Sequence, residues 1–411
     1  MKMNDKSLIL YARLVLFRGV NLKEDEDLVI NAPITAQDFV RALTQEAYKT
    51  FKSGNVHVNW QDPVLSRIAY LHAKDQVLED VPEYIFDRIR NTLNRKAAFL
   101  TISSSFPGLM ANIDQKRIQK AQKAMGSKMR PYQEEIAKTA KWSVAAYPCI
   151  PWAKKVFPDM EDSDALMQLH EDIVTIMRLD EEKPIDAWTK HLNALEQKRR
   201  KLNEYRFRRL EYKGEGTDLT VELPEKHIWV SGAQKRGDDV FLPNMPTEEV
   251  FTAPLKTGVN GRVRVTKPLN VRGTLIQPFS MTFKYGEVVE IKSDEKDKIE
   301  KIISLDKGAR FLGEVALVPK ESTINQLGRI YYNTLLDENA TCHFAFGNAY
   351  PMSVKDKGKN VQEIVERNNI NRSMIHIDFM VGDETLDIVG IKEDGERVPI
   401  FEKGTWASSF K

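Results

Sequence analysis

The sequence contains few cysteines and no long apolar segment. Its 411 residues include only Cys149 and Cys342, far apart in the chain, which argues against a secreted fold held together by disulfides. The apolar stretch 8–20 is interrupted by Arg13 and Arg18 and is too short to cross a bilayer. We therefore expect a cytoplasmic protein without a membrane partner.

The chain also lacks an excess of charge of either sign. Its 61 Lys and Arg residues nearly balance 59 Asp and Glu residues, which does not favour nucleic acid as a partner. The basic cluster 198–201 lies on a predicted helix, 185–210, beside Glu196 and Glu204. A solvated helix face is the simpler interpretation. The alternative is a binding surface for nucleic acid or another partner in a non-catalytic protein.

Compact catalytic signatures are absent as well. The sequence has no glycine-rich phosphate loop after its predicted strands, no His-Glu-x-x-His helix, no Gly-x-Ser-x-Gly elbow and no Cys-x-x-Cys pair. A nucleotide site therefore has no support. Any catalytic chemistry must come from residues dispersed along the chain.

Length and hydrophobic pattern predict two domains, because 411 residues exceed the size at which a single core usually stops growing. In the first half, short apolar runs typical of strands alternate with helical stretches; the strands are 28–30, 56–58, 98–102 and 143–150, and the helices include 38–51 and 84–95. This alternation predicts an α/β domain with a largely parallel sheet over residues 1–212.

The pattern changes near residue 212, where Gly214 and Gly216 break the helical periodicity. Beyond this point, short alternating segments predict an antiparallel or mixed sheet; they are 218–223, 261–265, 280–285 and 288–292. We expect an α+β C-terminal domain over residues 213–411.

Ionisable residues inside apolar strands of this second half are the candidates for function. In the strand-like segment 374–380, His376 and Asp378 project from one face, while Ile375, Ile377 and Phe379 lie on the other. Such a pair must bind each other, other protein groups or a metal ion. A structural His–Asp hydrogen bond is the alternative to a metal site.

Glu314 is the only acid in the apolar segment 310–319. A buried carboxylate without a partner costs several kcal/mol and tends to become protonated. A divalent cation removes that cost, and a buried pair with Arg or Lys is the alternative.

A third segment, 337–351, contains a histidine, an acid and a tyrosine near one end of a predicted strand. His343 opens the strand, Glu338 lies in the turn before it, and the flexible backbone at Gly347 brings Tyr350 towards the same end. Taken singly, these residues have ordinary structural interpretations. Cys342 faces away from His343 and is expected to be packed in the core.

A fourth segment, 243–254, is bounded by prolines and contains two adjacent acids, Glu248 and Glu249. Neighbouring residues cannot share one face, so we expect at most one of them to point inward.

The four segments together supply enough ligands for more than one cation. Mixed carboxylate and imidazole ligands suit Zn²⁺, Mn²⁺ or Co²⁺. One catalytic Zn²⁺ uses about three protein ligands and leaves a position open. Two cations that share a bridging carboxylate explain the number of candidates better.

At these residues the sequence resembles the thermophilic-type metallo-aminopeptidases, the family of aminopeptidase T and aminopeptidase S. The motifs that carry the resemblance occur in the same order and spacing along the second half; they are Asn-Met-Pro-Thr-Glu-Glu-Val-Phe-Thr-Ala-Pro (244–254), Leu-Gly-Glu-Val-Ala-Leu-Val (312–318), Asp-Glu-Asn-Ala-Thr-Cys-His-Phe-Ala-Phe-Gly-Asn-Ala-Tyr-Pro (337–351) and Ile-His-Ile-Asp-Phe-Met-Val-Gly (375–382). The likeness covers nearly the full chain.

The resemblance implies which residues hold the metals and which act on the substrate. The implied ligands are Glu248, Glu314, Glu338, His343, His376 and Asp378. We choose Glu314 as the bridging carboxylate and Tyr350 as the donor to the developing oxyanion. Glu248 and Glu249 both remain candidates for proton transfer. The resemblance also implies a homodimer and two divalent cations per subunit, drawn from Zn²⁺, Co²⁺ and Mn²⁺.

The function expected from the sequence is therefore metal-dependent aminopeptidase activity on peptides with a free N-terminus, through a water activated between two cations. A dinuclear amidohydrolase or phosphoesterase that acts on non-peptide substrates is the alternative, because such enzymes can use similar ligands.

Overall fold

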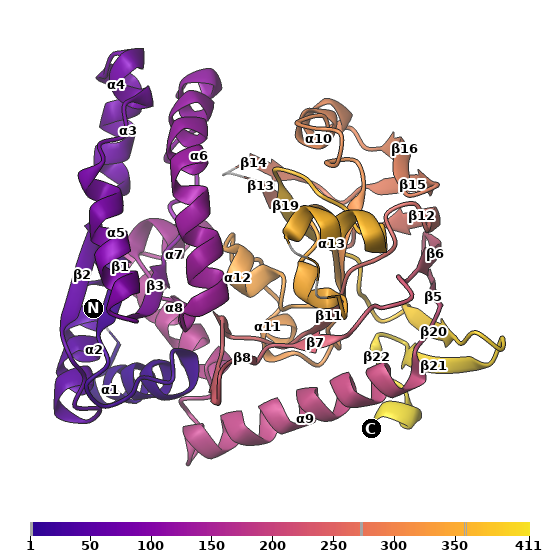
Figure 1. Ribbon diagram of the computed structural model, residues 1–411, viewed down its shortest axis with the longest axis horizontal. Coiled ribbons are helices and arrows are strands. Elements are labelled where there is room, and N and C mark those ends of the chain that lie inside the picture. Colours follow the sequence, from indigo (N-terminus) through magenta and orange to yellow (C-terminus); the bar gives the residue numbers. More distant parts are fainter. Residues whose placement is uncertain (1–2, 272–273, 357, 359) are drawn as a thin grey trace. The chain divides into compact units, whose positions relative to one another are not determined.

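The computed structural model describes residues 3–271, 274–356, 358 and 360–411, and its N-terminal part is built around a parallel sheet (Figure 1). The order is β2-β1-β3-β4-β10, and every neighbouring pair is parallel. The strands are β1 (Leu28–Pro33), β2 (Val56–Gln61), β3 (Ala98–Ser103), β4 (Trp142–Ala146) and β10 (Asn244–Met245). The predicted parallel sheet is confirmed, but β4 is shorter than the predicted strand 143–150 because a helix begins at Ile150.

Helices precede and connect these strands. They are α1 (Asp5–Leu14), α2 (Gln37–Lys49), α3 (Pro63–His72), α4 (Asp75–Glu79), α5 (Tyr84–Asn94), α6 (Gln115–Thr139), α7 (Ile150–Val156) and α8 (Asp162–Ile176). The predicted helices 38–51 and 84–95 are confirmed by α2 and α5. In the described parts of the chain, no helix combines the length and apolarity that a membrane crossing requires.

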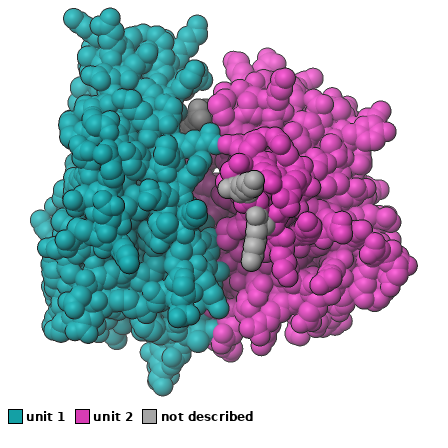
Figure 2. Space-filling model, viewed as in Figure 1, with its two compact units in different colours: residues 1–189, 233–246, 272–274 teal, residues 190–232, 247–271, 275–411 magenta. Residues whose placement is uncertain are grey.

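The chain divides into two compact units (Figure 2). Unit 1 comprises Met1–Thr189, Ala233–Pro246 and Arg272–Thr274; unit 2 comprises Lys190–Gly232, Thr247–Val271 and Leu275–Lys411. The chain first passes from unit 1 to unit 2 within the long helix α9 (Pro184–Tyr205), and later segments alternate between the units, whereas a single boundary near residue 212 was predicted. Most of α9 belongs to unit 2 because Leu195 and Leu202 are packed in that unit's core.

Unit 2 is built from two antiparallel sheets. The larger has the order β16-β15-β12-β6-β5-β20-β21-β22 and the smaller β19-β18-β17-β11-β7. The larger sheet contains β5 (Arg209–Gly214), β6 (Thr217–Glu222), β12 (Val259–Arg264), β15 (Ser280–Lys284), β16 (Glu287–Lys292), β20 (Asp387–Ile391), β21 (Arg397–Glu402) and β22 (Thr405–Trp406). The smaller contains β7 (Val230–Ser231), β11 (Val250–Thr252), β17 (Leu312–Leu317), β18 (His343–Gly347) and β19 (His376–Met380). The antiparallel strands predicted beyond residue 212 are confirmed.

Shorter elements complete the described fold. Unit 1 also contains the hairpin of β8 (Gln234–Arg236) and β9 (Asp239–Phe241). The strands β13 (Leu269–Val271) and β14 (Thr274–Ile276) form a separate two-stranded sheet. The α-helices of unit 2 that follow α9 are α10 (Lys296–Ile303), α11 (Thr323–Gln326), α12 (Thr334–Asp337) and α13 (Val361–Asn368).

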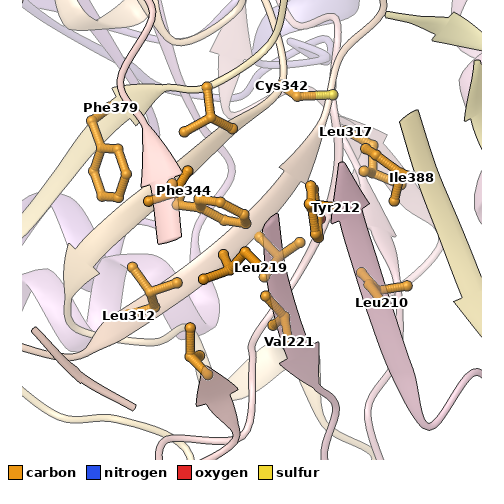
Figure 3. Packing of buried hydrophobic residues seen from close by; sticks show 14 of the residues in the cluster. Leu210, Tyr212, Leu219, Val221, Leu312, Leu317, Cys342, Phe344, Phe379 and Ile388 are labelled. Carbon is orange, nitrogen blue, oxygen red and sulfur yellow. The ribbon is translucent and has the colours of Figure 1, made fainter. Parts of the chain in front are cut away.

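One hydrophobic core joins the two sheets of unit 2 (Figure 3). The rings of Tyr212 from β5 and Phe344 from β18 meet edge to face, with centroids 5.1 Å apart. Cys342 is packed in the same core, as predicted, and both cysteines are free and buried. Because this core covers one face of the smaller sheet, the polar residues of β17, β18 and β19 are confined to its other face.

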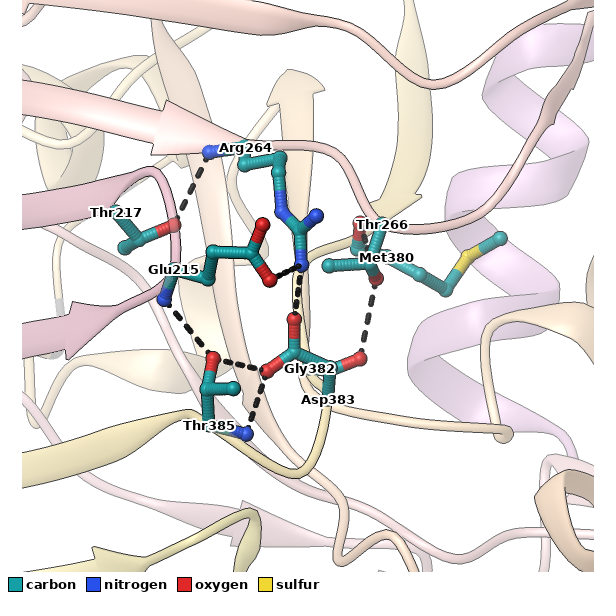
Figure 4. A network of polar contacts seen from close by, with 8 residues as sticks. All are labelled: Glu215, Thr217, Arg264, Thr266, Met380, Gly382, Asp383 and Thr385. Carbon is teal, nitrogen blue, oxygen red and sulfur yellow. Dashed lines mark hydrogen bonds and ion pairs between the residues drawn. The ribbon is translucent and has the colours of Figure 1, made fainter.

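A polar network fixes loops of unit 2 to the larger sheet (Figure 4). The guanidinium of Arg264 donates to Asp383 Oδ2 at 2.6 Å, and Thr385 Oγ1 donates to Asp383 Oδ1 at 2.6 Å. Thr266 Oγ1 donates to the carbonyls of Met380 and Gly382 at 3.3 and 3.1 Å. The chain is thus held immediately after β19, the strand that carries His376 and Asp378.

The buried His170 of α8 gives unit 1 a testable pH dependence. His170 is 5% exposed, and burial lowers its pKa from 6.5 to about 4. Between these values the unfolded chain binds a proton that the folded chain does not. Stability should therefore fall as the pH drops from 6.5 to 4, by at most about 3 kcal/mol. We expect the urea midpoint of unit 1 to decline less in His170→Gln than in the wild type between pH 7 and pH 5.

Hydrogen exchange of β1 and β3 peptides in urea measures this midpoint. The exposed His72 provides the control. The urea midpoint of His72→Gln should decline between pH 7 and pH 5 as that of the wild type does. An equal decline of the midpoint in the wild type and in His170→Gln would show that His170 does not cause the pH dependence.

Candidate metal centre

A β-bulge at Gly313 directs Glu314 out of the hydrophobic core. Leu312 and Val315 both belong to the core, although they are three positions apart in the strand, because the pairing of β17 with β18 shifts between Leu312 and Glu314. Without the shift, Glu314 would share the core face of Leu312, since residues two apart lie on one face. A Cβ on Gly313 would meet the carbonyl oxygens of Gly347 and Asn348 at 2.4 Å, so only glycine fits.

The other donors come from the neighbouring strands on the same face. His343 begins β18 and pairs with Met380 of β19, while Ala345 of β18 pairs with Asp378. His376 begins β19 and pairs with Gly347. The predicted common face of His376 and Asp378 is confirmed, because His376 Nε2 lies 3.2 Å from Asp378 Oδ1.

Glu314 lies between two groups of potential metal ligands. One group consists of Glu249, Glu314 and His343, and the other of Glu314, His376 and Asp378; within each group the donor atoms lie within 4.8 Å of one another. Glu314 Oε1 lies 3.6 Å from His343 Nε2, and Glu314 Oε2 lies 3.8 Å from His376 Nε2. Each carboxylate oxygen therefore faces a different group.

Backbone carbonyls orient both imidazole rings. His343 Nδ1 lies 3.2 Å from the Thr341 carbonyl oxygen, and His376 Nδ1 lies 2.8 Å from that of Asn348. A carbonyl only accepts, so each Nδ1 carries the hydrogen. In a neutral ring the lone pair is then on Nε2, which faces the carboxylates, and this is the usual outer support of a metal-binding histidine.

The adjacent acids Glu248 and Glu249 have different partners, although both are buried. Glu249 Oε2 lies 3.3 Å from His343 Nε2 and belongs to the first group. Glu248 is in neither group; its Oε2 lies 3.6 Å from Nε2 of His191 in α9. From the sequence we expected Glu248 as a metal ligand and either of the two acids as the carrier of the proton.

Glu338 and Tyr350 lie beside the two groups without being members of either. Glu338 follows α12, and its pKa is raised well above the ordinary value by burial and then by the charges of Asp378 and Glu249. The ring of Tyr350 lies against that of His376, with centroids 4.8 Å apart, and is 41% exposed. Desolvation of its hydroxyl, with the charge of Glu314, raises the pKa of Tyr350.

The charges of the cluster perturb one another strongly. Burial raises the pKa of Glu314. Burial alone would lower the pKa of His376, but the charges of Asp378 and Glu314 raise it to about 10. In the same way, Glu249 and Glu314 overcome burial and raise the pKa of His343. The cluster without cations therefore attracts protons to its imidazoles, as expected where negative charge is buried in excess.

The donor set fits divalent cations. Among the described residues, the buried Glu249 Oε2 has no hydrogen-bond partner, although it faces an imidazole nitrogen. Such an atom is costly unless a cation or proton satisfies it. Carboxylate oxygens with imidazole nitrogens are ligands typical of Zn²⁺, Co²⁺ and Mn²⁺.

Sequence reasoning missed three supporting residues. Gly313, His191 and Asn339 each act through segments distant in the sequence, so local patterns gave no signal for them. Gly313 and Asn339 carried a hint, because they lie next to Glu314 and Glu338 in recognised motifs, whereas His191 lies in no such motif.

Comparisons with known proteins identify the family of the chain. Residues 4–406 match the thermophilic metalloprotease (M29) family. The chain is 40% identical over 400 residues to aminopeptidase AmpS of Bacillus subtilis (strain 168), covering 97% of both chains. It is 36% identical over 398 residues to aminopeptidase T of Thermus thermophilus, covering 96% of this chain and 97% of the relative.

The solved structure of wild-type AmpT from Thermus thermophilus superposes with a TM-score of 0.92 at 35% identity, covering 98% of this chain and 99% of that chain. The resemblance inferred from the motifs is confirmed over nearly the whole length. The chain belongs to the thermophilic metalloprotease (M29) family.

Proposed function

We propose that this protein is a metal-dependent aminopeptidase that removes N-terminal residues from peptides with the help of two divalent cations. Family membership and the named activity of the relatives support the peptidase activity. The observation that carries the two-cation site is the position of Glu314, whose two oxygens face different groups of ligands.

The proposed ligands divide into two sets. Glu249 and His343 hold one cation, His376 and Asp378 hold the other, and Glu314 bridges them. Glu338, which the family resemblance implies as a ligand, belongs to neither group of ligand atoms and stays a prediction. In this proposal Glu249 takes the ligand role that the sequence analysis gave to Glu248, and Glu248 remains the candidate for proton transfer.

Bound cations would activate water for attack on the scissile carbonyl and would bind the free α-amino group of the substrate. An internal peptide nitrogen cannot supply that contact, which explains the restriction to N-termini. The chain's own residues orient the reaction. Tyr350, whose ring lies against that of His376, is the proposed hydrogen-bond donor to the oxyanion that would develop on the substrate. Its neutral form is maintained because its pKa is raised.

Three expectations from the sequence stay predictions. They are the identity of the cation among Zn²⁺, Co²⁺ and Mn²⁺, the homodimeric assembly and the cytoplasmic location.

The first test is removal of metal. The purified protein should contain two divalent cations per chain, and chelation should abolish hydrolysis of leucyl-p-nitroanilide, because the buried carboxylates then lack their counter-charge. Added Zn²⁺, Co²⁺ or Mn²⁺ should restore activity. The N-acetylated substrate should not react in any state. Full activity of a metal-free preparation would refute the proposal.

The second test separates the adjacent acids. Glu249→Gln should weaken binding of one cation by at least about 100-fold, since even loss of an outer support costs about 10–100-fold. Glu248→Gln should keep both cations, because its carboxylate faces His191. Metal titration against a competing chelator measures both variants. If Glu248→Gln instead loses a cation and Glu249→Gln keeps both, then Glu248 is the ligand.

The third test concerns Tyr350. Tyr350→Phe keeps the ring packed against His376 but removes the hydroxyl, so kcat should fall by about 100–1000-fold, while the metal content stays at the wild-type value. Steady-state kinetics and metal analysis on one preparation measure both quantities. An unchanged kcat would exclude Tyr350 as the oxyanion donor.

A further inference from the structure

The peptide group between Thr247 and Glu248 is held on both of its polar atoms by side chains from other segments. Its carbonyl oxygen lies 2.8 Å from Nε2 of His191, and its N–H donates to Oδ1 of Asn339 at 2.7 Å. Since a carbonyl only accepts, His191 carries its hydrogen on Nε2. The two anchors come from α9 and from the turn before β18, which lie 56 and 91 residues away in the sequence.

These contacts are well buried. Asn339 is 0% and Thr247 1% exposed. Asn339 is itself fixed, because its Nδ2 donates to the Leu335 carbonyl at 3.0 Å. Thr247 also packs directly against Gly232, where an added Cβ would come within 2.4 Å of Thr247 Oγ1. The peptide group therefore has little freedom to shift or rotate.

We propose that His191 and Asn339 are positioning residues that clamp this peptide group and so aim Glu249 at the metal centre. Rotation of a peptide group swings the side chains that flank it. With the group held from both sides, Glu248 stays beside His191 and Glu249 stays beside His343. The inference rests on the proposed role of Glu249 as a ligand.

The clamp also joins two segments that each supply an acid to the cluster. Asn339 directly follows Glu338. Its side chain accepts from the N–H of Glu248, the residue directly before Glu249. A buried amide at this position sets the spacing of these acids without adding a charge to a cluster already rich in carboxylates. The hydrogen bonds of His191 and Asn339 therefore support the proposed ligand through its backbone and not through its side chain.

The test compares metal affinity in variants that remove one anchor. His191→Phe removes the donor but keeps a ring, and Asn339→Leu removes the acceptor but keeps the branched shape. Each should weaken cation binding by about 10–100-fold in competition with a chelator, as loss of outer support does. His191→Gln retains an N–H donor and should recover much of the affinity. The double variant should bind little more weakly than either single variant, because one lost anchor already frees the peptide group.

Asn203 supplies the matched control. Its amide also bridges two segments of unit 2, accepting from the Trp229 N–H at 2.9 Å and donating to the Trp229 carbonyl at 3.0 Å, but it contacts none of the proposed ligands. Asn203→Leu should lower stability as Asn339→Leu does and leave the metal affinity unchanged.

Hydrogen exchange in the metal-free proteins gives a readout that does not require bound cations. Exchange over residues 247–250 should accelerate in His191→Phe and Asn339→Leu, but not in Asn203→Leu. If the wild type binds two cations and either single variant keeps the wild-type affinity for them, the proposed clamp is refuted. It is also refuted if the loss of affinity in the double variant equals the full sum of the losses in the single variants. A wild type that binds no cation refutes the proposed function instead.

Discussion

Repulsion among buried carboxylates is the constraint on which the centre of unit 2 depends. Glu249, Glu314 and Asp378 are each less than a tenth exposed and lie close to two imidazoles. Negative charges so close together cannot all persist in a low-dielectric interior without positive charge between them. Protons on the histidines provide part of that charge, and divalent cations provide it more completely. The same repulsion that would destabilise the fold therefore becomes the source of metal affinity.

The two faces of the smaller sheet of unit 2 have different roles, one in stability and the other in chemistry. One face contributes apolar side chains such as Phe344 and Phe379 to the core, while the other carries the ionisable groups. Gly313 makes this separation possible, because the bulge moves Glu314 from the core face to the polar face. A rigid strand then holds each donor more firmly than a loop could. The proposed ligand Glu249 lies outside these three strands, in the segment before β11, and this is the segment held by His191 and Asn339.

Much of this molecule could be predicted where the signal is local. Strand alternation placed His376 and Asp378 on one face and Cys342 in the core. The cost of burying a lone acid singled out Glu314. The alternation of apolar runs with helices predicted the parallel sheet of unit 1. The sequence motifs identified the family. Each of these conclusions needs only the period of a strand or helix, or the chemistry of a short segment.

The tertiary structure decided what depends on segments far apart in the chain. It brought Glu249, not Glu248, beside His343, and it assigned most of α9 to the core of unit 2, so that the change of unit falls before residue 212. It also revealed the shift of register at Gly313 and the two anchors on the 247–248 peptide group. A sequence determines the order of its polar and apolar groups directly. Two adjacent acids are both buried here, and only one of them, Glu249, faces the potential metal ligands; the hydrogen bonds that hold this segment come from residues more than fifty positions away and exist only after the chain has folded.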